Sequence, residues 1–281
     1  GNLGETHNQG FELELHHSNT IGKDFRYNIG FSFSHAKNKI VNMDEPAGKT
    51  DYRKREGHAI NQFFGLVCDG YVTSADLADA NFPKSTYGDV KVGDLKYRDM
   101  NGDGFIDSRD ETFIGLSDIP ENTYSLTLGA TYKGWGFNVM FQGVDHVSRY
   151  YDAEAMYEFV NGGKVKSLHM GRWNPNMSEE WNLANATYPL LHYDSFGNHN
   201  HQQNSFFLKN GAFLRLKNIE LSYSLPMQWI KHLAMSECRL FVNANNLITW
   251  DHLDDLVDPE SSGSNKYPIM KTVNFGVNIK F

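Results

Sequence analysis

The stretch 99–110, with the sequence DMNGDGFIDSRD, carries oxygen-bearing side chains at the spacing of a calcium-binding loop. Calcium in proteins takes about six to eight oxygen ligands, and a glycine at the sixth loop position permits the sharp turn. Gly104 stands at that position. The candidate ligands, with Phe105 contributing its backbone carbonyl, are Asp99, Asn101, Asp103, Phe105, Asp107 and Asp110.

Asp110 departs from this pattern, because the longer side chain of glutamate usually closes a calcium loop. An aspartate in that place requires a closer approach of the backbone. Carboxylates held this close repel one another unless a cation lies among them. We therefore predict a Ca²⁺ ion with a structural role, because protein ligands would saturate it. The alternative is a solvated acidic turn without an ion.

Two groups among the 12 histidines could bind a metal or a ligand. One is the adjacent pair His16 and His17. The other group, His192, His199 and His201, falls in a long polar stretch without the regular spacing of a metal site. We expect the second group to be solvated loop residues, with a metal or ligand site as the alternative.

Paired carboxylates can act as acid and base in glycoside cleavage, and two such pairs occur. Glu12 and Glu14 are two residues apart on one strand face, and Asp254 is next to Asp255. We expect both pairs to lie on a polar surface instead. The chain has no nucleophile elbow, phosphate-binding loop or HExxH motif, so nothing in the sequence predicts an enzyme.

Several large aromatic side chains fall in long polar segments. Exposed rings there could stack on sugars or anchor a partner protein, or they could pack the loops against each other. The sequence leaves both roles open. The candidates for contact with a substrate or partner are Trp173, Trp181, Tyr193, Phe196 and Trp250.

Strict alternation of apolar and polar residues identifies the elements that must position these groups. At the C-terminus, Val273, Phe275 and Val277 alternate with Asn274 and Gly276. This period of two is the pattern of a β-strand with one apolar face. Similar alternation predicts strands near residues 8–17, 25–36, 123–132, 135–144, 213–225, 239–249 and 271–281.

Three local features accompany the strands. Residues 74–80 predict a short helix with Ser74 as its N-cap, and residues 152–160 predict a helical turn. Leu214 and Leu216 lie on the opposite parity to the residues that follow, which predicts a bulge near Lys217.

Short and long links alternate between the strands. Outer-membrane barrels have short periplasmic turns and long extracellular loops, so we interpret the long links as extracellular excursions. Residues 58–72 belong to the first excursion, because another crossing strand there would break the alternation. The short links are residues 18–24, 133–134 and 226–236, and the long links are residues 37–122, 145–211 and 250–270.

Aromatic residues on the apolar parity collect beside the short links, as in the interfacial girdle of a barrel. They are Phe25, Tyr27, Tyr132, Trp135, Tyr223 and Phe281. The predicted fold class is all-β, an antiparallel transmembrane β-barrel with long extracellular loops. The alternative is a soluble β-sandwich, whose strands also carry core aromatics.

Composition is compatible with a barrel and narrows the partners. The mean hydropathy of −0.53 does not exclude a membrane protein, because strands with alternating faces average to a polar value. The net charge of −8, without a basic stripe, argues against nucleic acid. The two cysteines, Cys68 and Cys238, form no metal-binding spacing and offer at most one disulfide.

Seven sequence blocks resemble the C-terminal part of SusC/RagA-type TonB-dependent outer-membrane transporters. They occur in family order over nearly the whole chain, which makes the resemblance specific. The blocks are NQGFELEL (8–15), GDLKYRDMNGDGFIDSRDETFIG (93–115), YKGWGFNVMFQG (132–143), SFFLKNGAFLRLKNIELSYSLP (205–226), RLFVNANNLITW (239–250), DPE (258–260) and VNFGVNIKF (273–281).

The resemblance implies a barrel of about 22 strands with an N-terminal plug domain, of which this chain is the C-terminal third or so. It implies import of glycans or oligopeptides across the bacterial outer membrane, powered by the TonB complex. A SusD-like lipoprotein would cover the barrel. The plug domain and the TonB-contacting segment are not expected among the residues of this chain, which would contribute lipid-facing wall, lid-binding loops and the calcium loop.

The same resemblance suggests a role for the C-terminal residues. Asn274, Gly276, Ile279 and Phe281 resemble the signal that the barrel-assembly machinery reads. The sequence leaves two rival functions open. One is a TonB-dependent receptor for siderophores or vitamins without a lid lipoprotein. The other is a secreted calcium-binding β-sandwich adhesin or carbohydrate-binding module.

Overall fold

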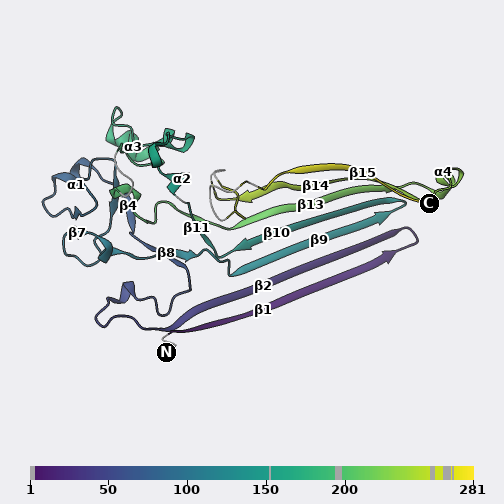
Figure 1. Ribbon diagram of the computed structural model, residues 1–281, viewed down its shortest axis with the longest axis horizontal. Helices are drawn as coiled ribbons and strands as arrows, with labels where there is room; N and C mark the ends of the chain where they lie inside the picture. The colour runs from purple at the N-terminus through teal and green to yellow at the C-terminus, as the bar shows by residue number, and fades with distance from the viewer. Residues whose placement is uncertain (1–3, 152, 194–197, 254–256, 262–266, 268) are drawn as a thin grey trace.

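One antiparallel sheet, which we call the wall, organises the chain. The computed structural model describes residues 4–151, 153–193, 198–253, 257–261, 267 and 269–281. Seven strands lie side by side in the order β1-β2-β9-β10-β13-β14-β15, with β1 and β15 at the edges (Figure 1). Their bounds are β1 Gly4–Ile21, β2 Phe25–Met43, β9 Asn122–Tyr132, β10 Trp135–Asp145, β13 Phe213–Ser224, β14 Glu237–Asp251 and β15 Thr272–Lys280. Each predicted strand overlaps one of these.

The short links contain residues in the left-handed conformation. Gly22 has a φ of +67° between β1 and β2, and the link between β9 and β10 is Lys133 and Gly134, with φ values of 46° and 91°. Two successive positive φ values suit the twist of a hairpin. The third short link contains α4 Met227–Ile230 and the 3₁₀ turn η6 Lys231–Leu233.

The wall has one apolar and one polar face, because cross-strand pairing keeps residues of the same parity in rows. One apolar row runs through Ile29, Leu128, Val139, Ile219, Ala244 and Val273. The neighbouring polar row runs through Asn28, Gly129, Asn138, Glu220, Asn243 and Asn274. Many side chains of the apolar face are exposed, including Leu15, Ile29, Leu221 and Phe275.

The predicted bulge near Lys217 is confirmed. The register of β13 shifts between Leu216 and Asn218 against β14, and opposite Met140 and Phe141 against β10. The extra residue restores the parity of the strand. Leu214 and Leu216 therefore lie on the same face as the apolar residues that follow the bulge.

Some predicted boundaries were wrong. β2 continues through polar residues to Met43, because its backbone stays paired with β1 as far as Gly4. β14 continues to Asp251, which places Trp250 in a strand and not in a loop. The short helix α1 Ser74–Ala78 has Thr73 as its N-cap, because the Thr73 hydroxyl accepts from the Asp76 N–H and the Asp76 carboxylate accepts from the Thr73 N–H.

The three long links come together at one end of the wall, opposite to α4 and the C-terminus (Figure 1). We call the described parts of these links, residues 44–121, 146–212 and 252–271, the loop body. In the first link lie η1 Asp51–Arg53, β3 Gln62–Gly65, β4 Cys68–Tyr71, α1, β5 Lys84–Ser85, β6 Leu95–Tyr97, β7 Phe105–Ile106, η2 Ser108–Asp110 and β8 Thr112–Ser117. In the second lie β11 Ser148–Tyr150, α2 Ala153–Met156, η3 Val160–Gly162, η4 Ser167–Gly171, α3 Glu179–Asn185, η5 His199–His201 and β12 Leu208–Asn210.

The prediction that residues 58–72 do not form a crossing strand is confirmed. Their short strands β3 and β4 pair within the first link, with β8 and β6. The predicted turn at 152–160 contains α2, and Asp152 itself lies outside the described residues.

The main hydrophobic core lies in the loop body and joins all three long links. The first link contributes Leu66, Leu95, Tyr97 and Ile106, the second Tyr151, Ala155, Met156, Tyr157, Tyr188 and Phe207, and the third Leu253. Burial of these side chains away from water is the main favourable term that holds the links together. Among the described residues, no helix has the length and apolar character needed to span a membrane.

Candidate functional site

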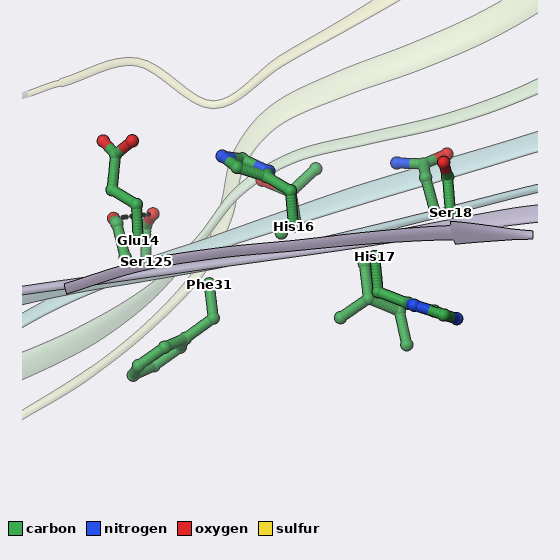
Figure 2. A pocket seen from close by; sticks show the side chains of 11 residues that line it. Glu14, His16, His17, Ser18, Phe31 and Ser125 are labelled. Carbon is green, nitrogen blue, oxygen red and sulfur yellow. Dashed lines mark hydrogen bonds between the residues drawn. The ribbon is translucent and has the colours of Figure 1, made fainter.

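The polar face of the wall contains a hollow of about 580 Å³ across β1, β2 and β9. Glu14, His16, Ser18 and Ser125 point to this face, whereas His17 and Phe31 point to the opposite one (Figure 2). Gly30 leaves room for the His16 ring, because a Cβ there would lie 3.1 Å from its Nδ1. On the polar face the hollow presents the carboxylate of Glu14, the imidazole of His16 and serine hydroxyls, which suit contact with water or a hydrophilic solute.

Hydrogen bonds between side chains continue along the polar face. The Ser32 and Ser125 hydroxyls lie 2.7 Å apart. On the same face, toward the β15 edge of the wall, Asn218 donates to Asn245 at 2.9 Å, and Asn274 donates to Asn243 at 2.9 Å. Arg239 is paired with Glu220 and also donates to Ser222 at 3.1 Å. The face is polar from β1 to β15.

Aromatic rings lie near both ends of the apolar face. Near the short links, the Trp135 and Tyr223 rings lie 4.8 Å apart and the Phe25 and Tyr132 rings 6.5 Å apart. At the loop-body end, Trp250 pairs across strands with Leu214 and therefore shares the apolar face. Amphipathic rings at two levels match the two interfaces of a membrane.

The structure corrects the prediction for the histidine group of residues 192–201. All three side chains are largely buried, and His192 and His199 join the second link to the first. His192 Nε2 lies 2.6 Å from Asp94 Oδ1, and Asn200 donates to the same Asp94 oxygen at 2.9 Å. Asp94 is fully buried, so these donors supply the hydrogen bonds that a buried carboxylate requires. The second link is polar in sequence, but these residues are not solvated, because their polar groups form hydrogen bonds with one another.

His199 is held through both of its ring nitrogens. Its Nε2 donates to the Leu95 carbonyl at 2.7 Å, and its Nδ1 lies 2.8 Å from the Ser85 hydroxyl. Burial lowers the pKa of His199. His169 is similar, because Nε2 donates to the Met156 carbonyl, Nδ1 accepts from the Lys166 N–H, and burial lowers its pKa.

A second buried pair joins Glu158 to His201, whose Nε2 lies 3.2 Å from Glu158 Oε2. Burial opposes the ionisation of Glu158, but the His201 contact and the His192 backbone N–H outweigh it and lower the pKa of Glu158 to about 2. The Tyr188 hydroxyl donates to the same carboxylate at 2.8 Å. Asp94, Glu158 and Asn200 were not singled out from the sequence, because isolated polar residues in a long link carry no periodic signal.

The predicted calcium loop has the expected backbone. Asp99 accepts from the N–H groups of Gly102 and Gly104, at 2.7 and 2.8 Å, and Gly104 has a φ of +79°. Asp110 is fully buried and accepts from the N–H groups of Met100 and Asp107, each at 2.9 Å. The sharp turn at Gly104 is therefore present.

The side chains of this loop are not arranged around a cation site. The Arg109 guanidinium lies 2.7 Å from both Asp103 and Asp107, and its hydrogen bonds lower the pKa of Asp107. In the described part of the chain, no three His, Cys, Asp or Glu side chains gather as a metal site. Asn101 donates to Asp103 at 3.0 Å, and the Phe105 ring is exposed.

The aromatic candidates do not form one surface. Trp173 is 3% exposed and packs beside Gly93 and Tyr71, so it supports the loop body and cannot contact a substrate directly. Tyr193 is 89% exposed and meets Phe159 edge to face. Trp181 on α3 is partly exposed, Trp250 lies on the apolar face of the wall, and Phe196 falls outside the described residues.

The residues of the predicted assembly signal occupy different environments. Asn274 and Gly276 belong to the polar face, and a Cβ on Gly276 would lie 2.2 Å from the Phe241 ring. Gly276 therefore makes room for that ring. Ile279 lies on the exposed apolar face, and Phe281 follows β15 and is exposed.

The remaining candidates are placed as follows. Glu12 and Glu14 lie on the exposed polar face of β1, whereas Asp254 and Asp255 fall outside the described residues. The two cysteines are free thiols. Cys68 donates to the Gly70 carbonyl, and burial raises the pKa of its thiol to about 11.

An antiparallel wall with an exposed apolar face, a polar face, short turns at one end and long folded links at the other defines a segment of an outer-membrane β-barrel. Residues 1–247 match the family model described as TonB dependent receptor-like, beta-barrel. The chain therefore belongs to the TonB-dependent receptor β-barrel family, whose members are located in the bacterial outer membrane. The β-sandwich alternative is wrong, because the seven strands form a single sheet.

The relatives are longer than this chain. TonB-dependent receptor P3 of Formosa agariphila is 26% identical, over 100% of this chain and 29% of its own length. TonB-dependent receptor SusC of Bacteroides thetaiotaomicron is 23% identical, over 100% and 27%. The solved RagAB peptide transporter has the same fold, with a TM-score of 0.71 and 21% identity over 100% of this chain and 30% of that one. The chain thus spans about 30% of the length of its curated relatives.

Proposed function

We propose that the complete protein imports glycans or oligopeptides across the outer membrane, and that this chain supplies barrel wall and loop body. The continuous polar face of the wall, from Ser18 on β1 to Asn274 on β15, carries this proposal. A hydrophilic solute needs a water-lined path, and a wall that is polar inside and apolar outside provides one. Groups spread in rows over seven strands suit binding and passage better than catalysis.

Two partners belong to the same proposal. A SusD-like lipoprotein would cover the loop body, and the TonB complex would act through parts of the complete protein outside this chain. The similarity to SusC and to RagAB supports this assignment. The rival is a receptor for siderophores or vitamins that works without a lid lipoprotein.

The structure does not favour a glycan over a peptide. The tryptophans of the long links would have favoured a sugar if they had formed a stacking platform. Instead Trp173 is buried and Trp250 lies on the apolar face of the wall. One solved relative is a peptide transporter, which makes oligopeptides an equal candidate.

Uptake by cells that express the complete protein tests the proposal. Fluorescent oligosaccharides and oligopeptides of graded length would be supplied to cells with and without the SusD-like lipoprotein. Each measurement would be repeated with an uncoupler of the proton-motive force. We expect energy-dependent uptake of one class that requires the lipoprotein. The rival would be favoured if the cells took up siderophores or vitamins without the lipoprotein and took up neither oligosaccharides nor oligopeptides.

We further propose that Ca²⁺ binds residues 99–110 with a structural role. The backbone turn at Gly104 and the buried Asp110 support it, and Arg109 is the internal cation that would give way. Calcium titration calorimetry should then show tighter binding in an Arg109→Ala variant and loss of binding in Asp103→Ala. If Asp103→Ala leaves both bound calcium and protease resistance of the first link unchanged, the proposal is wrong.

A further inference from the structure

Two of the sequence blocks that carry the family resemblance meet in space through Arg215 and Asp258, which are 43 positions apart in the chain. Arg215 lies near the loop-body end of β13, with a side chain that is 1% exposed. Its neighbours Leu214 and Leu216 lie on the apolar face, so Arg215 points to the polar face. In a barrel the polar face lines the lumen.

The carboxylates opposite Arg215 come from the third link. Arg215 donates to Asp258 at 2.7 Å and lies 2.7 Å from Glu260, which is also 2.9 Å from the Lys217 ammonium. The Glu260 N–H donates to the Asp258 side chain at 2.9 Å, and the Ser261 N–H donates to the Asp258 carbonyl at 2.8 Å. We call residues 258–261, which these bonds fold into a compact turn, the anchor turn.

The carboxylates of the anchor turn balance the charge of the buried Arg215 guanidinium. A guanidinium removed from water is costly unless carboxylates pair with it, and removal of one partner leaves an uncompensated charge. Asp258 and Glu260 are themselves mostly buried, at 14% and 21% side-chain exposure. The anchor turn therefore lies against the polar face of the wall.

Arg149 on β11 connects this arrangement to the other two links. Its guanidinium donates to the Pro259 carbonyl at 3.3 Å and to the Asp118 carbonyl at 3.4 Å. The anchor turn is thus held by wall strand β13 and by the second link, and the second link is held to the first.

We propose that Arg215 and Lys217 are positioning residues that hold the anchor turn over the lumen and thereby set the shape of the opening that substrate enters. Arg149, on the second link, holds the anchor turn and the first link together through its hydrogen bonds to Pro259 and Asp118. The part of this proposal that concerns substrate rests on the proposed import function, whereas the anchor itself does not.

The test uses the complete transporter with its partner lipoprotein in the outer membrane. Arg215→Glu should speed protease cleavage within residues 251–271 at least about tenfold, because the anchor turn loses its buried counter-charge. The concentration that half-saturates uptake should rise, while the maximal rate per barrel stays within about twofold. The double variant Arg215→Glu, Asp258→Arg should return cleavage and half-saturation toward the wild type, because the pair is restored with reversed signs.

Two further variants keep the test decisive. Lys133→Glu reverses an exposed charge in a short link and should change neither readout. Asp258→Asn with Glu260→Gln weakens the anchor from the loop side, without altering the wall, and should reproduce the faster cleavage. Unchanged cleavage in this variant, or no rescue by the charge swap, overturns the anchor.

Uptake separates the two proposals. If cleavage responds as expected but half-saturation stays constant while uptake proceeds, the anchor does not shape the opening and that part is overturned. If the wild-type protein takes up neither oligosaccharides nor oligopeptides, the proposed function fails, and cleavage still decides whether the anchor exists.

Discussion

The wall and the loop body are stable by different means. In the wall, backbone ladders join the strands, and apolar side chains such as Phe275, 83% exposed, point outward. In the loop body, Leu66 and Phe207 are fully buried, and buried polar groups such as Asp94 are paired. The wall therefore relies on lipid to cover its apolar face, whereas the loop body carries its own core. A substitution of the same kind should therefore have different effects on stability in the two regions.

The largest expected effect is in the loop-body core. Phe207→Ala removes a ring that packs against Tyr157 and Phe206, at centroid distances of 5.3 and 5.1 Å. The free energy of unfolding of the loop body should fall by about 3–5 kcal/mol, with the wall unaffected. Limited proteolysis of the long links would measure the first part, and heat-modifiable gel migration the second. The matched variant Phe137→Ala, on the apolar face, should leave the links resistant.

A charge should separate the two faces of the wall. Leu221→Arg puts a cation among the lipid-facing residues beside Phe137 and Val242, and should destabilise the barrel by about 2–4 kcal/mol. Thr127→Arg, in the polar hollow, should cost far less because the lumen is wet. The folded fraction of the complete barrel in urea and lipid vesicles measures both. Equal losses would contradict the assignment of the faces.

Gly276 allows packing to be separated from an assembly signal. Gly276→Ala should cost about 1–3 kcal/mol, because its Cβ would meet the Phe241 ring. Phe241→Ala should rescue it if packing is the reason. The yield of folded barrel in the outer membrane is the readout. A double variant that assembles as poorly as Gly276→Ala would instead support the assembly-signal hypothesis.

Acid should loosen the loop body before the wall. Burial lowers the pKa of His169 and His199, so both contribute stability above their unfolded pKa, about 6.5, which is lost as the pH falls through the lowered folded values. The free energy of unfolding should decrease by up to about 1.4 kcal/mol per pH unit for each histidine in that window. Glu158, with its pKa of about 2, adds a further loss only as the pH falls below 4.5.

Protease resistance of the long links as a function of pH measures this effect. Replacing His169 and His199 with glutamine should flatten the profile below a pH of about 6.5, whatever it does to stability at neutral pH. A profile unchanged by these replacements would show that other groups carry the acid sensitivity.

The smallest effect should come from a helix cap. Thr73→Ala removes the hydroxyl that accepts from the Asp76 N–H at 3.2 Å, and should cost about 1 kcal/mol locally. Hydrogen exchange at α1 should speed up while exchange in β9 and β10 stays the same. Ser74→Ala is the control, because Ser74 was the predicted cap and the structure assigns that role to Thr73.

Much of the wall could be predicted because its signal is local. Alternation shows which residues share a face, and a break in parity located the bulge at Lys217. Strand ends were less certain, because β2 and β14 are extended by pairing with neighbours and not by their own side chains. The calcium motif correctly predicted the turn at Gly104, but not that Arg109 would lie against its carboxylates.

The sequence by itself determined the wall: strands with two faces, a bulge, short turns at one end and long links at the other. Each of these depends on residues close together in the chain. Tertiary structure alone decided that His192 reaches Asp94, 98 residues away, and that Arg215 is buried against Asp258. The physical reason is that a buried polar group must find a partner, and no local pattern shows which distant residue will supply it.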